Sequence, residues 1–439
     1  MKRHSCIRLE LLSVLLFLST SLTAREWKNS SGKMIEAEIL GLEQGNAVVL
    51  MAGKQRALLP IGKLSANDQA WLNEWARNKS PAQQLAPPVW PETVLQQEIK
   101  LTGGKSKEGV FVFHSPHYEF NCDAEVSASV MNDFATVAEG TLRLIYSLPL
   151  HFPPLEGRTF GARICQSRMV YERAGGPPGS AGVFILGNMS GKGMLLVPFE
   201  SLGIEKFAGR NTKSYNYHAT VLIHEMAHQT TAELLPLMPK WVAEGLAEYA
   251  GNMIYRNGVF YLGARDRVQA LRQRLETYDK LTREQDAQVM ASPSNKPPAP
   301  SSAVPVRLPE SWIMRPSELV KKTDRDWSTN VNSKAAHIQL HRMYLSSMFL
   351  VHYYLHMADN GEARRIRLYF DELTTDSAWF RTQGRGGEPA PSYLRSDSSI
   401  EEIRSHYLQH LFKSDDLAAL DADFRAKYIA LGFRIPEWK

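Results

Sequence analysis

The sequence predicts an α+β protein in which a small β unit precedes a larger domain with an α-rich C-terminal half. Three observations support this class. Short alternating apolar runs separated by glycines fill residues 25–78, strand and helix signals mix over 94–215, and helical periodicity dominates from 216 onward. The 439 residues are 44% hydrophobic and 22% charged, which is the composition of packed globular domains rather than of a collagen or a disordered chain.

Residues 1–24 have the pattern of an export signal. Lys2, Arg3 and Arg8 precede an apolar run at 11–18, and Ala24 offers a small residue for cleavage. The alternative is a membrane anchor, but a bilayer core needs about 20 apolar residues and this run is much shorter. We therefore expect a secreted or periplasmic protein, and no other stretch is apolar enough to predict a membrane span.

Residues 25–78 read as a separate small unit. A helix is expected to begin after Ser65 as N-cap, with Asp68 as its capping-box partner. Residues 79–93 contain four prolines and are predicted to be a linker. The strands expected before the helix are 34–40, 47–51 and 56–59.

This unit resembles a Sla-homology domain, which is an SH3-like β-barrel. The resemblance rests on Arg25-Glu26-Trp27, Gly32-Lys33, Ile35-Glu36-Ala37-Glu38 and Lys63-Leu64-Ser65 followed by Asp68-Gln69. It implies a barrel that takes short peptides as ligands, or one that is an accessory module with no ligand of its own.

The rest of the chain, 94–439, reads as one larger domain. Strands are expected at 110–113 and 118–121, and long helices at 126–147 and 335–357. Residues 291–309 are rich in proline and serine, which predicts an exposed loop.

Charge and cysteine content limit the partners of the chain. The formal net charge of +5 is too small and too scattered to indicate nucleic-acid binding. Cys122 and Cys165 lie outside the expected signal, in a chain that should meet an oxidising compartment. A disulfide between them and two buried free thiols are equally compatible with the sequence.

The pentapeptide His224-Glu225-Met226-Ala227-His228 carries the clearest chemistry. Four residues apart on a helix, His224 and His228 project from one face and can share a Zn²⁺ ion. Glu225 lies beside them, where a carboxylate can take a proton from zinc-bound water. A core helix whose histidines are only hydrogen-bonded is the alternative, but burying Glu225 without a metal would be costly.

A third zinc ligand is expected on the next helix. After a turn containing two prolines, Glu244 and Glu248 are again four residues apart, so one carboxylate can bind zinc while the other supports a ligand. Both share a helix face, so their roles could be exchanged. We favour Glu244 as the ligand because the adjacent Gly245 would let this helix approach the histidine helix closely.

Here the chain resembles the gluzincin metallopeptidases, and most closely an exported bacterial group of gluzincin-like proteins. The matching segments are His117–Phe120, Gly175–Phe184, Val197–Glu200 and the run from His224 to Tyr249. The resemblance implies a gluzincin fold with His224, His228 and Glu244 as zinc ligands, Glu225 as base and Glu248 orienting a histidine. It also implies that a strand containing Gly182, Val183 and Phe184 lines the cleft and pairs with the substrate backbone.

The predicted activity is zinc-dependent hydrolysis of peptide bonds in peptide or protein substrates. Two alternatives remain: a non-catalytic zinc-containing binding protein, and a hydrolase of cell-wall amide bonds. The group that stabilises the oxyanion is open among four tyrosines, and Tyr344 is kept as the candidate although core packing also explains it. The other three are Tyr249, Tyr255 and Tyr261.

Two further histidine pairs have the same spacing, His337/His341 and His352/His356. Neither pair has a glutamate beside it, and both lie in a strongly amphipathic stretch. We expect these side chains to be solvated or packed rather than bound to a metal.

Overall fold

The structure is a computed structural model with two compact units, which meet in the sequence between Pro87 and Pro88. The expected signal, 1–24, lies outside the described residues except for Ala24, and the expected loop at 291–309 lies wholly outside them. The described residues are 24–95, 99–105, 110–187, 193–207, 210–213, 219–290, 311–328, 334–382, 390–395, 398–412 and 416–438.

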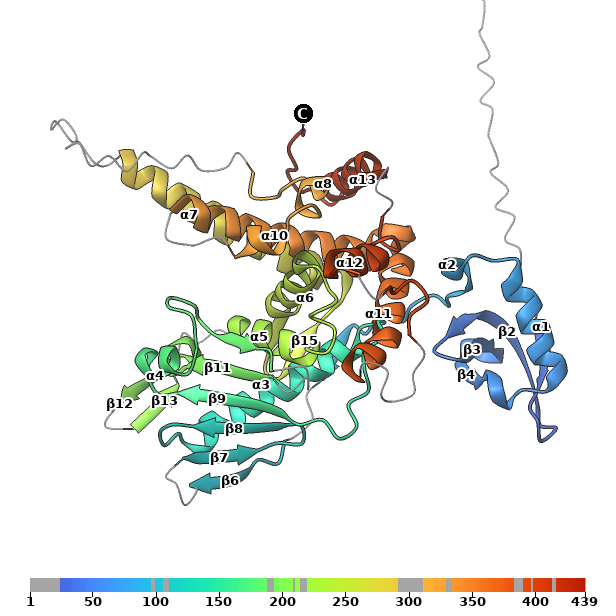
Figure 1. Cartoon of the computed structure of the whole chain (residues 1–439), viewed down its shortest axis with the longest axis horizontal. Coiled ribbons are helices and arrows are strands. Elements are labelled where there is room, and N and C mark those ends of the chain that lie inside the picture. Colours follow the sequence, from blue (N-terminus) through green and yellow to red (C-terminus); the bar gives the residue numbers. More distant parts are fainter. Residues whose placement is uncertain are drawn as a thin grey trace, which may run out of the picture. The chain divides into compact units, whose positions relative to one another are not determined.

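The first unit is a four-stranded antiparallel sheet followed by a helix (Figure 1). Its strands pair in sequence order and form an open sheet, with a bulge between Ile39 and Gly41. The three predicted strands are confirmed, and a first strand is added before them. The elements are β1 (Arg25–Lys28), β2 (Met34–Glu43), β3 (Asn46–Met51), β4 (Arg56–Pro60), α1 (Ala66–Arg77) and α2 (Pro81–Gln84).

Helix α1 begins as predicted, because the Ser65 side chain accepts a hydrogen bond from the backbone N–H of Asp68. Asp68 does not complete the expected capping box. Its carboxylate instead accepts from the backbone N–H of Lys28 at 2.8 Å and pairs with Arg25, so it joins the helix to β1. A buried carboxylate with several donors is satisfied, and this contact closes the small core around Trp27 and Leu72.

The second unit is built on a six-stranded mixed sheet of order β10-β11-β9-β8-β7-β6. The pairs β11–β9 and β9–β8 are parallel and the others are antiparallel, so the sheet is not a doubly wound parallel one. The strands are β6 (Thr102–Lys105), β7 (Phe111–His114), β8 (Tyr118–Cys122), β9 (Phe160–Cys165), β10 (Val183–Ile185) and β11 (Met194–Pro198).

The two faces of this sheet are covered by different helices. Phe120 and Cys122 face α3 (Ala128–Ser147) and lie in the main core, whereas Cys165 and Leu196 pack with Tyr171 of α4 (Arg168–Arg173) on the other face. In the parallel pair Cys122 lies opposite Ile164, so Cys165 points to the other side. The two thiols are therefore buried, free and separated by the sheet.

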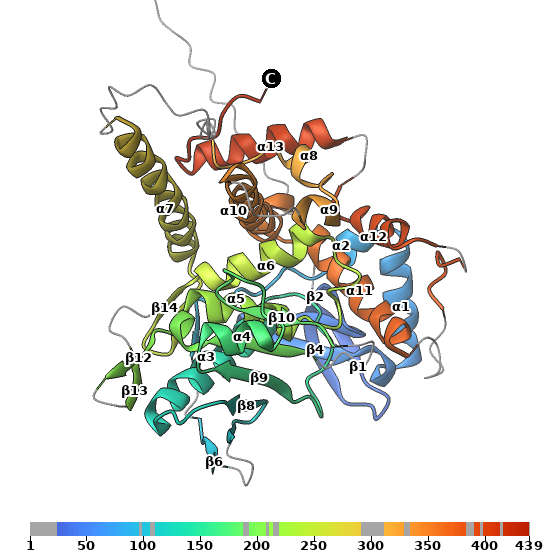
Figure 2. The same ribbon diagram turned by 60° about the vertical axis from the view of Figure 1, so that its left-hand side comes forward.

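Helices stack above the main-core face of the sheet in the order α5, α6 and α10 (Figures 1 and 2). Contacts join α3 to α5, α5 to α6, and α6 to α10. The α-rich C-terminal half is confirmed. Its helices are α5 (Thr220–Thr230), α6 (Lys240–Asn252), α7 (Ala264–Met290), α8 (Pro316–Leu319), α9 (Asp324–Trp327), α10 (Lys334–His356), α11 (Arg364–Thr382), α12 (Ile400–Leu408) and α13 (Leu417–Ala430).

Two short hairpins were not foreseen in the sequence. One pairs β12 (Ile204–Phe207) with β13 (Arg210–Lys213). The other pairs β14 (Ile254–Arg256) with β15 (Val259–Tyr261), and β5 (Thr93–Leu95) adds a third strand. Asn257 and Gly258 both have positive φ at its turn, and an Asn-Gly pair between apolar residues is the usual sequence signal for such a hairpin.

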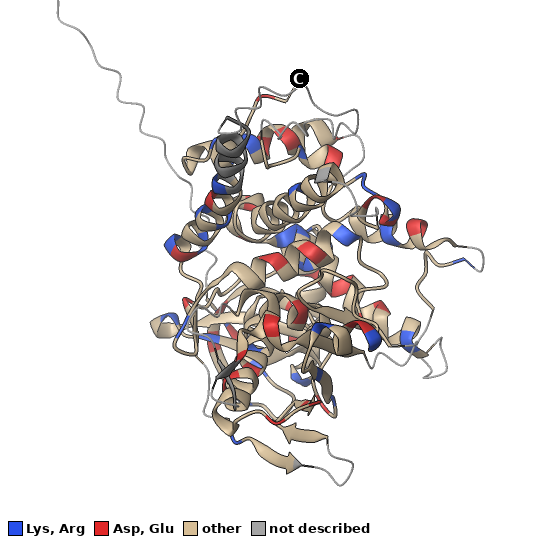
Figure 3. Ribbon diagram, turned by 90° about the vertical axis from the view of Figure 1, so that its left-hand side faces the viewer, with Lys and Arg blue, Asp and Glu red and all other residues tan. Residues whose placement is uncertain are grey.

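Acidic and basic positions are interspersed along the ribbon in the view of Figure 3. Among the described residues, none of the helices combines the length and the apolar character needed to cross a bilayer.

The close contact between α6 and α10 depends on a glycine, which has no side chain. A Cβ added to Gly245 of α6 would lie 2.5 Å from the Ser347 carbonyl oxygen and 2.7 Å from Val351, both on α10. The expectation that Gly245 brings α6 to the histidine helix is wrong. Gly251 has that role, since a Cβ there would lie 3.0 Å from the Thr220 carbonyl oxygen and 3.3 Å from the Cβ of His224 on α5.

Replacing Gly245 by Ala should therefore force α6 and α10 apart and lower the free energy of unfolding by about 1–3 kcal/mol, as overpacked cores do. Denaturant unfolding in the presence of a chelator measures this without a contribution from bound metal. Gly104→Ala is the matched control, because nothing lies within 4 Å of its added Cβ. Equal stability of the two variants would contradict the close-packing role.

Candidate metal centre

Helix α5 presents the two histidines of the pentapeptide on one face. Its apolar residues Leu222, Ile223, Met226 and Ala227 are buried in the main core, which leaves the face with His224 and His228 turned toward α6. The Nε2 atoms of the two imidazoles lie 3.2 Å apart. The i,i+4 spacing on a helix therefore does bring the two rings together.

Helix α6 supplies the carboxylates. Nearly all of its residues are buried, and it begins at Lys240, directly after Pro239 as N-cap. The Glu244 carboxylate oxygen Oε2 lies 3.0 Å from Nε2 of His228 and 3.4 Å from Nε2 of His224. These three ligand atoms form the only group of at least three His, Cys, Asp or Glu side chains with metal-site spacing among the described residues.

The size of this triangle tests whether the residues fit zinc. Zn²⁺ binds imidazole nitrogen and carboxylate oxygen at about 2.0–2.2 Å in a tetrahedron, which places neighbouring ligand atoms about 3.3 Å apart. The observed separations of 3.0, 3.2 and 3.4 Å match that edge. Two nitrogens and one oxygen also form the donor set that leaves a fourth position open in catalytic zinc sites.

Glu248 lies behind His224 and does not join the triangle. Its Oε1 is 3.4 Å from Nδ1 of His224, while Oε2 accepts from Asn252 at 2.9 Å and from Arg274 of α7 at 3.0 Å. A carboxylate on Nδ1 holds the proton there and leaves Nε2 free to bind a metal. The carboxylate nearest to both Nε2 atoms is thus Glu244, and Glu248 lies in the orienting position.

The cluster carries buried negative charge. Burial opposes ionisation of Glu244, but His228 and His224 outweigh it and hold the pKa of Glu244 well below its usual value. Burial likewise opposes ionisation of Glu248, yet His224 and Arg274 lower its pKa to about 2. The same two carboxylates raise the pKa of His224 against its own burial. An imidazolium and a divalent cation would therefore compete for this site, as expected where metal binding displaces protons.

Glu225 faces the edge of the sheet rather than the histidines. Its Oε2 accepts a hydrogen bond from the backbone N–H of Phe184 at 2.9 Å. A Cβ added to Gly182 would lie 3.3 Å from the Glu225 side chain, so this glycine lets β10 approach α5. Residues 182–184 and the pentapeptide thus meet, although they are 41 residues apart at the hydrogen bond.

The segment before β10 is held in place by polar contacts. The Ser180 hydroxyl is within 2.6 Å of the Tyr171 hydroxyl and donates to the Pro177 carbonyl at 2.7 Å. Arg168 donates to the Ser180 carbonyl and to Glu200. Among the described strands β10 pairs with β11 alone, so its other edge is the end of this sheet as far as the described residues go.

Tyr344 of α10 contacts the cluster through the ring of His224. Its ring meets that of His224 edge-on with centroids 6.1 Å apart, and the ring of Trp327 packs against it from the other side. Glu244, then burial and Glu225, raise the pKa of Tyr344, so its hydroxyl stays a neutral donor. Tyr249 is fully buried with its hydroxyl 2.8 Å from His356, and Tyr255 and Tyr261 belong to the β14–β15 hairpin.

The other histidine pairs differ in their surroundings. His352 is 2% exposed with Nδ1 2.9 Å from the Tyr428 hydroxyl, and His356 is paired with Tyr249, so this pair is packed as expected. His337 is exposed and His341 half-buried, with their Nε2 atoms 2.8 Å apart. Burial, His337 and Arg274 lower the pKa of His341 to about 4, so that imidazole is neutral at physiological pH.

A fourth pair with the same spacing, His406/His410, was overlooked in the sequence. Nε2 of His406 lies 3.0 Å from one oxygen of Glu372 of α11, and Nε2 of His410 lies 2.5 Å from the other. This carboxylate bridges the two rings, so they do not converge on one point.

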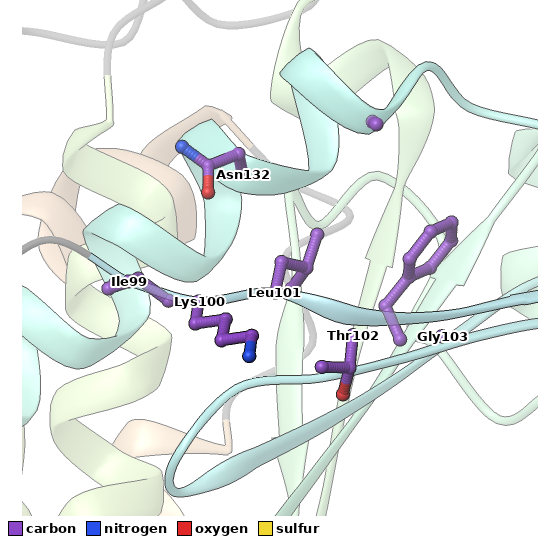
Figure 4. A pocket seen from close by; sticks show the side chains of 8 residues that line it. Ile99, Lys100, Leu101, Thr102, Gly103 and Asn132 are labelled. Atoms are coloured by element: carbon purple, nitrogen blue, oxygen red, sulfur yellow. The ribbon is translucent and has the colours of Figure 1, made fainter.

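A separate hollow of about 700 Å³ lies beside β6 and the first turns of α3 (Figure 4). None of the predicted site residues lines it. Its walls are formed by Ile99, Lys100, Leu101, Thr102, Gly103, Phe113, Ala128 and Asn132.

Comparison of the chain with protein-family models, with curated proteins and with solved structures finds no match.

The supporting residues Arg274, Asn252 and Trp327 were missed in the sequence. Asn252 is four residues after Glu248 on the same helix, so helical spacing could have identified it. Arg274 lies 26 residues after Glu248 and Trp327 ends the separate helix α9, so no local spacing points to either.

The buried His352 should make stability depend on pH. Burial lowers its pKa to about 3 from 6.5, so the unfolded chain binds its proton more readily than the folded one. This neutral histidine therefore stabilises the fold fully above pH 6.5 and progressively less as the pH falls, by up to about 1.4 kcal/mol per pH unit.

His352→Gln can keep a hydrogen bond to Tyr428 but cannot titrate. Its free energy of unfolding, measured by denaturant between pH 7 and pH 4.5, should fall less steeply than that of the unaltered protein. Parallel curves for the two proteins would show that His352 is not the titrating group.

Proposed function

We propose that this protein is an exported, secreted or periplasmic, zinc-dependent metallopeptidase of the gluzincin type. The observation that carries the proposal is the triangle of His224, His228 and Glu244 ligand atoms, whose edges match a zinc tetrahedron. Glu225 follows His224 directly in the chain, and its carboxylate accepts the N–H of Phe184. A purely structural zinc site needs no base, so the presence of Glu225 favours catalysis over binding.

The charge of the cluster supports a divalent cation. Two carboxylates, Glu244 and Glu248, lie against the two imidazoles, and the guanidinium of Arg274 pairs with Glu248. Glu225 adds a third negative charge, which also raises the pKa of His224. Burying unbalanced carboxylates is costly, and a bound dication would neutralise the excess.

In the proposed reaction each residue has a separate task. When bound, Zn²⁺ would act as a Lewis acid and lower the pKa of a water molecule to about 7. Glu225 would accept the proton of the attacking water and deliver it to the leaving nitrogen. The Tyr344 hydroxyl, which stays protonated beside Glu244, would donate a hydrogen bond to the oxyanion. Glu248, held by Arg274 and Asn252, would keep His224 in the tautomer that binds through Nε2.

The free edge of β10 would hold the substrate backbone. Phe184 donates its N–H to Glu225 and not to β11, so its backbone groups face the open side of the strand. An extended peptide added along Gly182, Val183 and Phe184 would therefore pass directly beside the base.

The first unit is proposed to be an SH3-like barrel of the Sla-homology type that binds short peptides. Its four-stranded meander supports this assignment, with the bulge at Ile39 and Gly41 bending β2. An isolated bridge between Asn29 and Leu64 also draws the end of β1 toward the segment that follows β4.

The decisive experiment is a digest of unfolded casein and, separately, of purified peptidoglycan, each with and without a chelator. We expect casein cleavage that stops when the metal is removed. Glu225→Gln should keep zinc, because this side chain is not a ligand, and lose activity by about 10²–10⁴-fold. Glu276→Gln, an exposed site on α7, is the control and should stay active.

Cleavage of peptidoglycan alone would indicate an amidase of the cell wall. Stoichiometric zinc with no cleavage of either substrate would instead identify a zinc-containing binding protein.

Alanine substitutions of the two carboxylates of α6 should have different effects on the amount of bound zinc. Glu244→Ala removes one of three ligands, so zinc should no longer copurify with the protein. Glu248→Ala removes only the orienting partner of His224, and metal affinity or activity should fall about 10–100-fold. Zinc per chain, measured by elemental analysis after dialysis, decides the assignment. If Glu244→Ala retains zinc and Glu248→Ala loses it, Glu248 is the ligand and Glu244 is the orienting residue.

A further inference from the structure

We propose that His337 and His341 form a second transition-metal site, at the outer end of α10, suited to Cu²⁺ or Ni²⁺ rather than to tetrahedral zinc. The chain has four histidine pairs with i,i+4 spacing. In only two of them, among the described residues, do the Nε2 atoms face each other: His224/His228 at 3.2 Å and His337/His341 at 2.8 Å.

The other two pairs show that spacing alone does not produce this convergence. His352 and His356 are turned to separate tyrosine hydroxyls, and His406 and His410 are turned to separate oxygens of Glu372. The facing of His337 and His341 is therefore a property of their surroundings.

The separation of the two nitrogens indicates the class of metal. With metal–nitrogen bonds of about 2.0–2.1 Å, atoms 2.8 Å apart subtend about 86° at the ion. That is the angle between neighbouring ligands in a square-planar or tetragonal centre, which is the geometry of Cu²⁺ and Ni²⁺. The described residues offer no third His, Cys, Asp or Glu here, so water would complete the coordination.

A supporting hydrogen bond orients the inner ring. Nδ1 of His341 lies 3.2 Å from the hydroxyl of Tyr278, which is buried and packed against Trp312 with ring centroids 4.9 Å apart. A partner on Nδ1 fixes the imidazole and directs the Nε2 lone pair outward, as the supporting partners of metal-bound histidines do. The exposed ring of His337 leaves the site open to solvent.

The positive charge of Arg274, which lies near His341, is balanced by the Glu248 carboxylate. Arg274 lies against the Tyr278 ring and would repel a cation at His341, but its guanidinium is 3.0 Å from the Glu248 carboxylate. Metal binding by His337 and His341 does not require the protein to be a peptidase.

The test is a titration of the full-length, zinc-loaded protein with Cu²⁺. We expect one equivalent of copper beyond the zinc already bound, with nitrogen hyperfine structure in the electron paramagnetic resonance spectrum. The two thiols in the described part of the chain, Cys122 and Cys165, are buried, so they should not reduce the ion. His337→Ala, an exposed position, should lose this equivalent and keep its zinc. Tyr278→Phe should bind copper about 10-fold more weakly.

His406→Ala is the matched control, because it breaks a pair of the same spacing whose rings do not converge. It should bind copper like the unaltered protein. The proposal is overturned if His337→Ala takes up copper with unchanged stoichiometry and affinity, or if His406→Ala costs as much binding as His337→Ala. Copper uptake matched by zinc release, with no additional equivalent, also overturns it.

Discussion

The contact between α5 and α6 buries four ionisable side chains, and the surrounding structure is organised to satisfy them. Glu244 and Glu248 are 9% and 7% exposed, and each is charged against the opposing effect of burial. Such groups are tolerated inside a protein only when donors or cations lie close by. Here the imidazoles of α5, the amide of Asn252 and the guanidinium of Arg274 provide them.

This constraint explains why α6 is packed so closely on both sides. Gly251 lets it approach α5, and Gly245 lets it approach α10. A larger side chain at Gly251 would separate ligand atoms that now lie 3.0–3.4 Å apart. The same contact with α10 places Tyr344 beside His224, and α7 follows the β14–β15 hairpin so that Arg274 can reach Glu248. Helices far apart in the sequence thus share one polar cluster beside the main hydrophobic core.

The mixed sheet contributes an edge as well as a core. Its antiparallel end strand β10 pairs on one side only among the described strands, and the hydrogen bond from Phe184 to Glu225 joins that strand to α5. The segment before it is held through Ser180, Tyr171 and Arg168. The glycine- and proline-rich stretch at 175–182 is thereby part of the scaffold of the candidate site, because it sets where the free edge lies.

Local sequence patterns were sufficient to predict many of the secondary-structure elements of this protein. The α+β class, the strands of the first unit, the Ser65 cap and the long helices at α3 and α10 follow from periodicity and capping chemistry, which act within a few residues. The facing of His224 and His228 also followed from spacing, since i,i+4 residues share a helix face. Glu244 was expected to join them from the next helix. The hairpin at β14–β15 was missed although Asn257-Gly258 signals it.

Other features depend on which elements meet, and that is decided by packing over the whole chain. The sequence left the pairing of Cys122 and Cys165 open, and the parallel register of β8 and β9 places them on opposite faces. From the sequence we expected Gly245 to allow the close approach of α6 to α5, but Gly251 is the residue that allows it. The sequence offered no route to Arg274 or Trp327, and it could not tell a facing histidine pair from one that is turned apart. The spacing of residues along the sequence determines which side chains share a face of one helix or strand. Only the tertiary contacts determine which other element that face packs against.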